Sequence, residues 1–265
     1  MLHELLVALP HEDFVYLGDT ARFPYGTRTP EELRAFSLEI ADLLLAQQAK
    51  LLMVACNSAT AAALGALEAH VSAVADGVDV IGVVMPESQV AVEATHNGRI
   101  GLLATPATVA SGAYTRAVAH CDPHVEVVSV ACPDLAPIIQ GGFPFDQRVV
   151  DTVRSYCEPL RAAEVDTVIL GCTHYPLVRP MLQRSLGRDI TLVTSGAAAA
   201  ARVERALAVR GLDSPRTGEG DYRFLCTGDV EVFRSLGTRF LQMPLGDVAH
   251  VDVAPGAGAG AGVSA

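Results

Sequence analysis

The 265-residue chain is almost without lysine, because Lys50 stands alone against eighteen arginines. Enzymes that use pyridoxal phosphate bind it as a Schiff base on a lysine. Lys50 directly precedes the apolar run that begins at Leu51. It therefore lies at the opposite end of that predicted strand from the end where ligands bind. The sequence argues against pyridoxal chemistry, and we expect no cofactor.

Positive charge is scarce in the chain as a whole. Nineteen lysines and arginines face thirty aspartates and glutamates, which gives a formal net charge of -11. The sequence has no basic footprint, so neither nucleic acid nor an anionic membrane surface is an expected partner. A small anionic ligand stays compatible with this charge, because local dipoles govern such a site more than net charge does.

Long hydrophobic runs, a secretory signal and a disulfide framework are also missing. Half of the residues are hydrophobic, but glycine, proline or charge interrupts every run well before the roughly 18 residues of a membrane span. No charged start leads into an apolar stretch and a cleavage site. The cysteines lack the pattern of a small disulfide-rich protein, so we expect reduced thiols and a cytoplasmic location. They are Cys56, Cys121, Cys132, Cys157, Cys172 and Cys226.

Short apolar runs alternate with helical patterns along the chain. This alternation favours an α/β protein with parallel sheets that helices cover on both faces. The expected strands are Phe14–Leu17, Leu51–Ala55, Val80–Val84, Ile100–Ala104, Val125–Val130, Val165–Leu170, Ile190–Val193 and Phe224–Cys226.

Helix signals lie between these strands. In "TPEEL", Thr29 is a typical N-cap, Pro30 suits the first helical position and Glu32 completes a capping box. Alanine-rich helices are expected at 59–67 and at 197–209, the second ending near glycine 211.

The number of strand and helix units predicts two doubly wound parallel-sheet domains, related by pseudo-twofold symmetry, with the active site in the cleft between them. A polar turn before residue 100 and a break near 213–221 suggest the boundaries. We expect residues 97–211 to form one domain, inserted into another built from 1–96 and 212–250. The low-complexity tail, 251–265, is expected to be disordered.

Two segments repeat one pattern: "LLMVACNSAT" around Cys56 and "TVILGCTHYPL" around Cys172. Each has an apolar strand, a small residue, a cysteine, polar residues and then a helix. Ligands of open parallel sheets bind beyond the carboxyl ends of the strands. The amides and dipole of a helix N-terminus would also stabilise a thiolate there. The repeat therefore predicts two half-sites that face each other across one cleft.

Cysteine at the end of a strand is more often a packing residue, and this interpretation suits the other four cysteines. Two opposed thiols instead suit inversion of a carbon centre, which needs a base on one side and an acid on the other. Each thiol can take either role if its pKa is tuned toward the working pH. A hydrolase needs one nucleophile and a histidine, and no G-x-S-x-G elbow is present.

Four motifs resemble those of glutamate racemases, within the aspartate/glutamate racemase superfamily: "FVYLGDTARFPYGTRT", "VACNSATAAAL", "RIGLLATPATVASGAY" and "LGCTHYPLV". The resemblance extends to about residue 245. It implies cofactor-independent interconversion of L- and D-glutamate, the latter for peptidoglycan. It also implies that Cys56 abstracts the α-proton of D-glutamate and Cys172 that of L-glutamate.

The same resemblance implies the remaining site residues and the assembly. His174 would assist Cys172 in proton transfer, and it favours glutamate because related aspartate racemases tend to carry Glu there. Relatives form dimers, so a homodimer is expected. The substrate contacts would come from Tyr25, Gly26, Asn57, Ser58, Thr173 and His174.

Metal binding is the alternative for the histidines. A histidine two residues after a cysteine can be a zinc ligand or a surface cap. The cluster "HCDPH", from His120 to His124, matches no structural zinc spacing and is interpreted as a polar loop. We therefore expect no metal.

Three departures from the family pattern matter. Relatives begin with an extra strand and a glycine-rich turn that bears an Asp-Ser pair, whereas this chain opens in a predicted helix. We therefore expect the true start to lie upstream and the chain as given to be poorly active. Ser58 stands where Thr is common and keeps the hydroxyl. Gln140 stands where a Glu is expected near the second cysteine, and glutamine carries no charge.

Alternatives to a glutamate racemase remain open. The nearest is an aspartate or hydantoin racemase of the same superfamily. A single-thiol decarboxylase is disfavoured by the presence of both cysteines. From another class, an inactive small-molecule binding homologue is compatible with the missing first strand.

Overall fold

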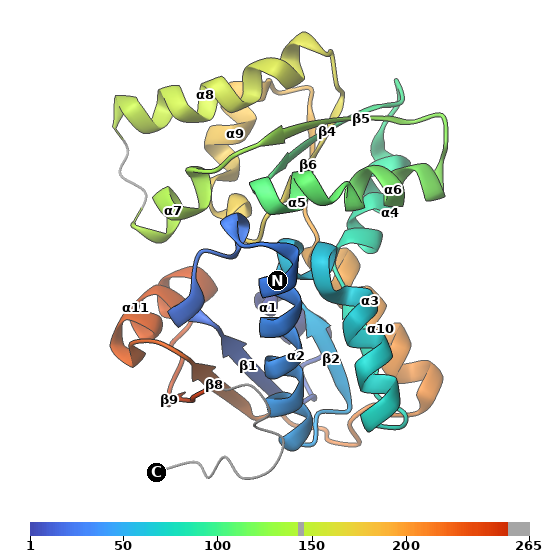
Figure 1. Ribbon diagram of the computed structural model, residues 1–265, viewed down its shortest axis with the longest axis vertical. Coiled ribbons are helices and arrows are strands. Elements are labelled where there is room, and N and C mark those ends of the chain that lie inside the picture. The colour runs from blue at the N-terminus through green and yellow to red at the C-terminus, as the bar shows by residue number, and fades with distance from the viewer. Residues whose placement is uncertain (143–145, 254–265) are drawn as a thin grey trace.

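The computed structural model describes residues 1–142 and 146–253. It forms the expected α/β architecture from nine parallel strands within these ranges (Figure 1). The strands are β1 (Phe14–Gly18), β2 (Leu51–Val54), β3 (Asp79–Gly82), β4 (Arg99–Ala104), β5 (Glu126–Ala131), β6 (Thr167–Gly171), β7 (Thr191–Val193), β8 (Tyr222–Cys226) and β9 (Val248–His250).

Helices connect the strands. They are α1 (Leu2–Ala8), α2 (Pro30–Ala46), α3 (Asn57–Val74), α4 (Val84–Ala94), α5 (Pro106–Ser111), α6 (Ala113–Cys121), α7 (Leu135–Gln140), α8 (Gln147–Ala162), α9 (Arg179–Leu186), α10 (Gly196–Arg210) and α11 (Val230–Leu241). Short 3-10 turns occur at η1 (Thr20–Arg22), η2 (Tyr25–Thr27) and η3 (Tyr175–Val178).

Local sequence signals explain several element ends. The capping box of α2 is confirmed: the Thr29 hydroxyl accepts from the amide of Glu32 at 3.2 Å, and the Glu32 carboxylate accepts from the amide of Thr29 at 2.9 Å. The predicted end of α10 is also confirmed, at Gly211 with φ of 62°. That left-handed conformation favours glycine.

The sheet β5-β4-β6-β7 occupies the upper half of Figure 1. Successive residues of a strand point to opposite faces, so each face has its own core. Leu103 and Leu170 pack with α7, α8 and α9. Leu102 and Ile169 pack with α4 and α6 on the other face. Both faces are therefore covered, as the doubly wound prediction requires.

The lower half of Figure 1 contains two smaller parallel sheets, β1-β8-β9 and β2-β3. Helices α2 and α3 cover β2, around the buried Leu52 and Ala63. Helices α1 and α10 pack on β3 around Ile81. β1 and β2 form no ladder with each other in the described part of the chain, so each has an unpaired edge. The expected extra strand ahead of Met1 stays a prediction.

The C-terminal end differs from the prediction at one point. Strand β9 was not expected, and it pairs with β8. Val251 then donates its amide to the carbonyl of Cys226 at 2.9 Å, so the first residue of the predicted disordered tail is held against β8. Residues 254–265 lie outside the described residues.

The division of the chain at 97 and 212 stays a proposal, and the packing of two helices bears on it. Helix α4 lies before residue 97 but packs on the sheet β5-β4-β6-β7. Helix α10 lies before residue 212 but packs against α1 and β3.

Asp166 ties the turn before β4 to the start of β6. Its carboxylate accepts from the Thr95 hydroxyl at 2.6 Å and from the amides of His96 and Asn97 at 2.7 and 2.8 Å. Burial raises the pKa of this carboxyl, but the hydrogen bonds outweigh burial and hold the pKa below its ordinary value. Their stabilisation is therefore present at neutral pH and lost as the pH falls through that lowered pKa.

We predict that Asp166→Ala lowers the free energy of unfolding at pH 7 by about 2 to 3 kcal/mol, because hydrogen bonds to a charged group are lost. Urea unfolding measures the change. Asp166→Asn should cost less, because its amide oxygen can still accept. The exposed Asp151→Ala is the matched control, and an equal cost for both alanine variants would contradict the prediction.

Candidate active site

The two cysteines of the repeated pattern lie where the sequence places them, at the carboxyl ends of parallel strands. Cys56 follows β2 and is the N-cap residue of α3. Cys172 directly follows β6 and is 8% exposed. Both line one cavity of about 1410 Å³, and the other predicted site residues line it too: Tyr25, Gly26, Asn57, Ser58, Thr173 and His174.

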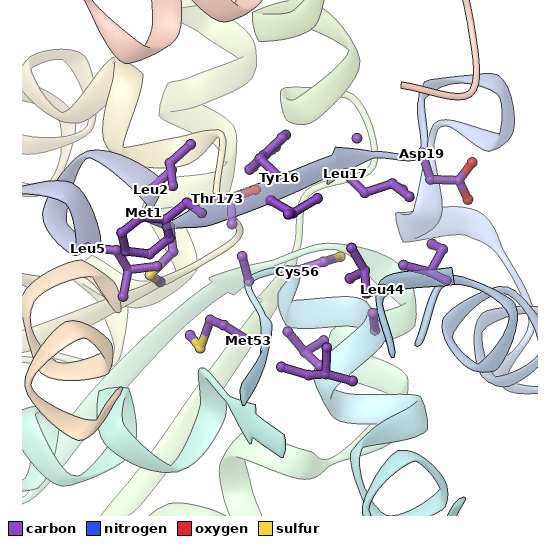
Figure 2. A pocket seen from close by; sticks show the side chains of 18 of the residues that line it. Met1, Leu2, Leu5, Tyr16, Leu17, Asp19, Leu44, Met53, Cys56 and Thr173 are labelled. Atoms are coloured by element: carbon purple, nitrogen blue, oxygen red, sulfur yellow. The ribbon is translucent and has the colours of Figure 1, made fainter. Parts of the chain in front are cut away.

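The cavity continues from this polar end into the space between β1 and β2. Figure 2 shows Cys56 and Thr173 together with the apolar side chains that line the rest of it. Those labelled are Met1, Leu2, Leu5, Leu17, Leu44 and Met53. The unpaired edges of β1 and β2 thus border an apolar space that opens onto the cysteines.

The pKa values of the two thiols differ from the sequence expectation of thiolates stabilised by helix amides. Burial raises the pKa of Cys56, and the hydrogen bonds from the amides of Ala59 and Ser58 do not offset it. Burial likewise raises the pKa of Cys172 to about 12, against hydrogen bonds from the amides of His174 and Tyr175. Desolvation outweighs the amides at both thiols, although Cys56 is only half-buried and Cys172 is buried. With their pKa values raised above that of an ordinary thiol, both cysteines are protonated at neutral pH.

His174 contacts Cys172 directly. Its Nδ1 lies 3.8 Å from the Cys172 sulfur, and its Nε2 lies 2.9 Å from Oε1 of Gln140. The amide oxygen of Gln140 is only an acceptor, so Nε2 carries the hydrogen. Nδ1 then has a free lone pair directed at the thiol. The geometry places the Nδ1 atom of His174 as a hydrogen-bond acceptor for the Cys172 thiol.

The imidazole of His174 is neutral at physiological pH. Burial lowers its pKa to about 4, and the rings of Phe23 and Phe240 lie with centroids at 5.9 and 6.2 Å. Gln140 fixes the tautomer of the ring but supplies no charge to favour the imidazolium. The glutamine at this position therefore orients His174 without raising its basicity.

The Tyr25–Gly26 turn packs across from the other half of the molecule. A Cβ at Gly26 would lie 2.6 Å from the Cβ of Thr105, so only glycine fits. The Tyr25 hydroxyl donates to the carboxylate of Asp19. Asp19 also accepts from Arg22 at 2.6 Å and from Thr227 at 2.7 Å.

The sequence analysis missed Asp19 as a residue of this cavity. It directly follows Gly18, the last residue of β1. The rule that led to both cysteines, a polar residue just beyond the carboxyl end of a parallel strand, would also have found it.

Ser58 and Asn57 are buried and hydrogen-bonded away from the solvent. The hydroxyl of Ser58 lies 2.8 Å from that of Thr105 and 3.0 Å from that of Thr108. Asn57 donates to Glu87 and Tyr114. Thr105, Glu87 and Tyr114 were also missed, because their partners lie 27 to 57 residues away in sequence.

The remaining cysteines fit the packing interpretation. Cys132, Cys157 and Cys226 are fully buried in apolar clusters, and Cys121 is half-buried. Among residues 1–142 and 146–253, no group of three or more His, Cys, Asp or Glu side chains is placed to hold a metal ion. In the same ranges no helix has the length and apolar character needed to cross a membrane.

A family profile described as Asp/Glu/Hydantoin racemase matches residues 2–203. The chain belongs to this family. It is 40% identical over 253 residues to a glutamate racemase of Geobacter metallireducens, covering 96% of this chain and 92% of the relative. A glutamate racemase of Beutenbergia cavernae is 42% identical over 253 residues, covering 92% and 86%.

Solved structures agree with the sequence relatives. Glutamate racemase RacE1 of Bacillus anthracis superposes with a TM-score of 0.89 at 34% identity, covering 95% of this chain and 92% of that one. The Francisella tularensis glutamate racemase in complex with D-glutamate has a TM-score of 0.87 at 29% identity, with the same coverage. The predicted membership of the superfamily and the two-domain α/β fold are confirmed. The chain is an amino-acid racemase, an isomerase.

We predict that Gln140→Glu raises the pKa of His174 above its present value of about 4, because a carboxylate beside Nε2 favours the imidazolium. Titration of the His174 ring protons by NMR measures this pKa. The exposed Gln147→Glu is the control and should leave it unchanged. A His174 pKa that is the same in Gln140→Glu as in the parent would contradict the tautomer assignment.

Proposed function

We propose that this racemase interconverts L-glutamate and D-glutamate without a cofactor, by acid/base chemistry at Cys56 and Cys172. The observation that carries the proposal is the placement of both thiols on one cavity at the ends of β2 and β6. Burial raises the pKa of Cys172, and a negative charge on Cys56 raises it further, so a thiolate at one cysteine disfavours a thiolate at the other.

Each turnover needs one thiolate and one thiol. The thiolate takes the α-proton from one face of the substrate, and the thiol returns a proton to the opposite face. The pair of sulfurs then holds the same number of protons with the roles exchanged. In this scheme Cys56 acts as the base for D-glutamate and Cys172 as the base for L-glutamate.

Because the pKa values of both thiols are raised, formation of a thiolate needs a positive charge nearby, and the substrate can supply it. The α-ammonium group of a bound amino acid is a positive charge close to the reacting carbon. A cation within a few ångströms favours a thiolate. For Cys172, the Nδ1 atom of His174 is a proton acceptor already in contact. We infer that a thiolate forms only when the amino acid is bound.

Glutamate is the proposed substrate because the relatives are named for it. The Francisella tularensis structure contains D-glutamate, and the Escherichia coli glutamate racemase, with a TM-score of 0.75 at 26% identity, contains L-glutamate and an activator. In this chain Tyr25, Gly26, Asn57, Ser58 and Thr173 are the proposed substrate contacts. The proposal includes supply of D-glutamate for peptidoglycan, a cytoplasmic location and a homodimer.

We predict that Cys56→Ala and Cys172→Ala each lower racemisation by at least ~100-fold, in both directions, because each removes one proton donor or acceptor. Circular dichroism of glutamate measures the turnover. Cys121→Ser, on the outer helix α6, is the control and should retain parental activity. Turnover within a few fold of the parent in either alanine variant would refute the two-thiol scheme.

Aspartate racemase is the second candidate, since the matched family also includes enzymes named for aspartate and hydantoin. We predict faster exchange of the α-hydrogen with deuterium for L- and D-glutamate than for L- and D-aspartate. Mass spectrometry of both amino acids after incubation in deuterium oxide decides this. Faster exchange of aspartate would change the substrate assignment, and binding without exchange of either would indicate an inactive homologue.

A further inference from the structure

Glu87 is a buried carboxyl group that has no role in the proposed two-thiol mechanism. It lies on α4 and is 0% exposed. The hydrogen bonds of a buried polar group largely offset the cost of removing that group from water, so the net gain in stability is small. Fold stability alone therefore gives little reason for a carboxyl at this point, and its contacts indicate another reason.

The contacts of Glu87 lead directly to the residue after Cys56. Asn57 Nδ2 donates to Glu87 Oε2 at 3.2 Å and to the Tyr114 hydroxyl at 2.6 Å. The Tyr114 hydroxyl donates in turn to the same Oε2 atom of Glu87. The three side chains come from α3, α4 and α6 and close a ring of hydrogen bonds.

This ring determines the orientation of the Asn57 amide. An asparagine has two N–H donors and one carbonyl oxygen. Glu87 and Tyr114 take up the donors, and the Oδ1 atom of Asn57 has no partner although it is buried. Asn57 also lines the cavity that contains both cysteines. The two hydrogen bonds thus leave Oδ1 as the end of the Asn57 amide that can still accept a hydrogen bond.

We propose that Glu87 is a positioning residue, which acts with Tyr114 to fix which end of the Asn57 amide is presented to the substrate. The proposal rests on the proposed function, in which Asn57 contacts glutamate. With Nδ2 held by Glu87, Asn57 presents an acceptor, and the matching group of an amino acid is its ammonium. Without the carboxyl, the amide is free to reverse.

The protonation state of Glu87 adds a pH dependence to this role. Burial raises the pKa of Glu87 to about 8, and the hydrogen bonds from Tyr114 and Asn57 oppose that rise. The titratable groups that face it are Tyr114 on α6 and the Cys172 thiol after β6. From α3 it meets the Asn57 amide, and ahead of α10 the backbone amide of Ser195. A protonated Glu87 gains a donor and holds Nδ2 less strongly.

The experiment measures glutamate binding by isothermal titration calorimetry and turnover by circular dichroism, on the full chain. Glu87→Ala should raise the Kd for glutamate about tenfold, in line with the cost of one lost hydrogen-bonded contact, with a smaller change in kcat. Glu87→Gln keeps an acceptor oxygen and should recover most of the affinity. In the Asn57→Ala background, Glu87→Ala should add little, because coupled residues are not additive.

Two control variants separate positioning from general destabilisation. Glu93→Gln changes an exposed carboxyl on the same helix and should leave Kd unchanged. Val118→Ala opens a space in the apolar cluster that contains Tyr114, without touching the ring of hydrogen bonds. It should lower the melting temperature but not raise the Kd. An equal rise in Kd for Val118→Ala and Glu87→Ala would overturn the proposal.

A second measurement does not depend on activity. The side-chain amide resonances of Asn57 in a ¹⁵N NMR spectrum should shift with a midpoint near pH 8 in the parent, the pKa of Glu87. The shift should be absent in Glu87→Gln. A parent titration identical to that of Glu87→Gln, or an unchanged Kd in Glu87→Ala, would overturn this inference alone. Failure of the parent to bind glutamate would overturn the proposed function as well.

Discussion

The site depends on one physical constraint, the desolvation of the Cys56 and Cys172 sulfur atoms. Strands β2 and β6 belong to different sheets, and the residues just beyond their carboxyl ends line one cavity between them. The same arrangement buries the thiols, so that burial raises the pKa of both. A protonated thiol cannot take the α-proton of a substrate, because only the thiolate is a base. In the proposed mechanism, the ammonium group of the bound amino acid would favour formation of the thiolate.

On one side of the cavity, the desolvated Cys172 thiol contacts His174, and His174 contacts Gln140. The ring of His174 is dry enough to remain neutral, and Gln140 sets its tautomer at 2.9 Å. Cys56 instead receives hydrogen bonds from the backbone amides of Ala59 and Ser58 and from the side chain of Ser58. The two half-sites that look alike in sequence are chemically different. In the proposed mechanism, proton transfer on the two faces of the substrate would therefore depend on different neighbouring residues.

Much of the fold was predictable from local patterns in the sequence. Apolar runs bounded by small or polar residues predicted β1 to β8, and the capping box predicted the start of α2. Strand β9 was missed because it has three residues and no alternating pattern. The helix expected after Cys172 and its polar residues begins as the 3-10 turn η3, and α9 starts at Arg179.

The candidate site was predictable where its residues follow strand ends, and not where it depends on distant partners. Cys56, Asn57, Cys172 and His174 are in that first group. Glu87 lies on a helix, and no sequence pattern near it predicts its contacts with Asn57 and Tyr114. The direction of the thiol pKa values was also beyond the sequence, since it depends on the depth of burial, which only the packed structure fixes.

The close packing of Gly26 against Thr105 has a consequence for the movement of the two halves. The turn η2 belongs to the half with β1 and β2, whereas Thr105 follows β4 in the other half. Gly26 has only a hydrogen atom where other residues have a side chain. The backbone at Gly26 can therefore lie close to the side chain of Thr105. Any larger residue would act as a wedge that props the cavity open. The contact between Gly26 and Thr105 thus limits the distance between the two halves at this point of the cavity.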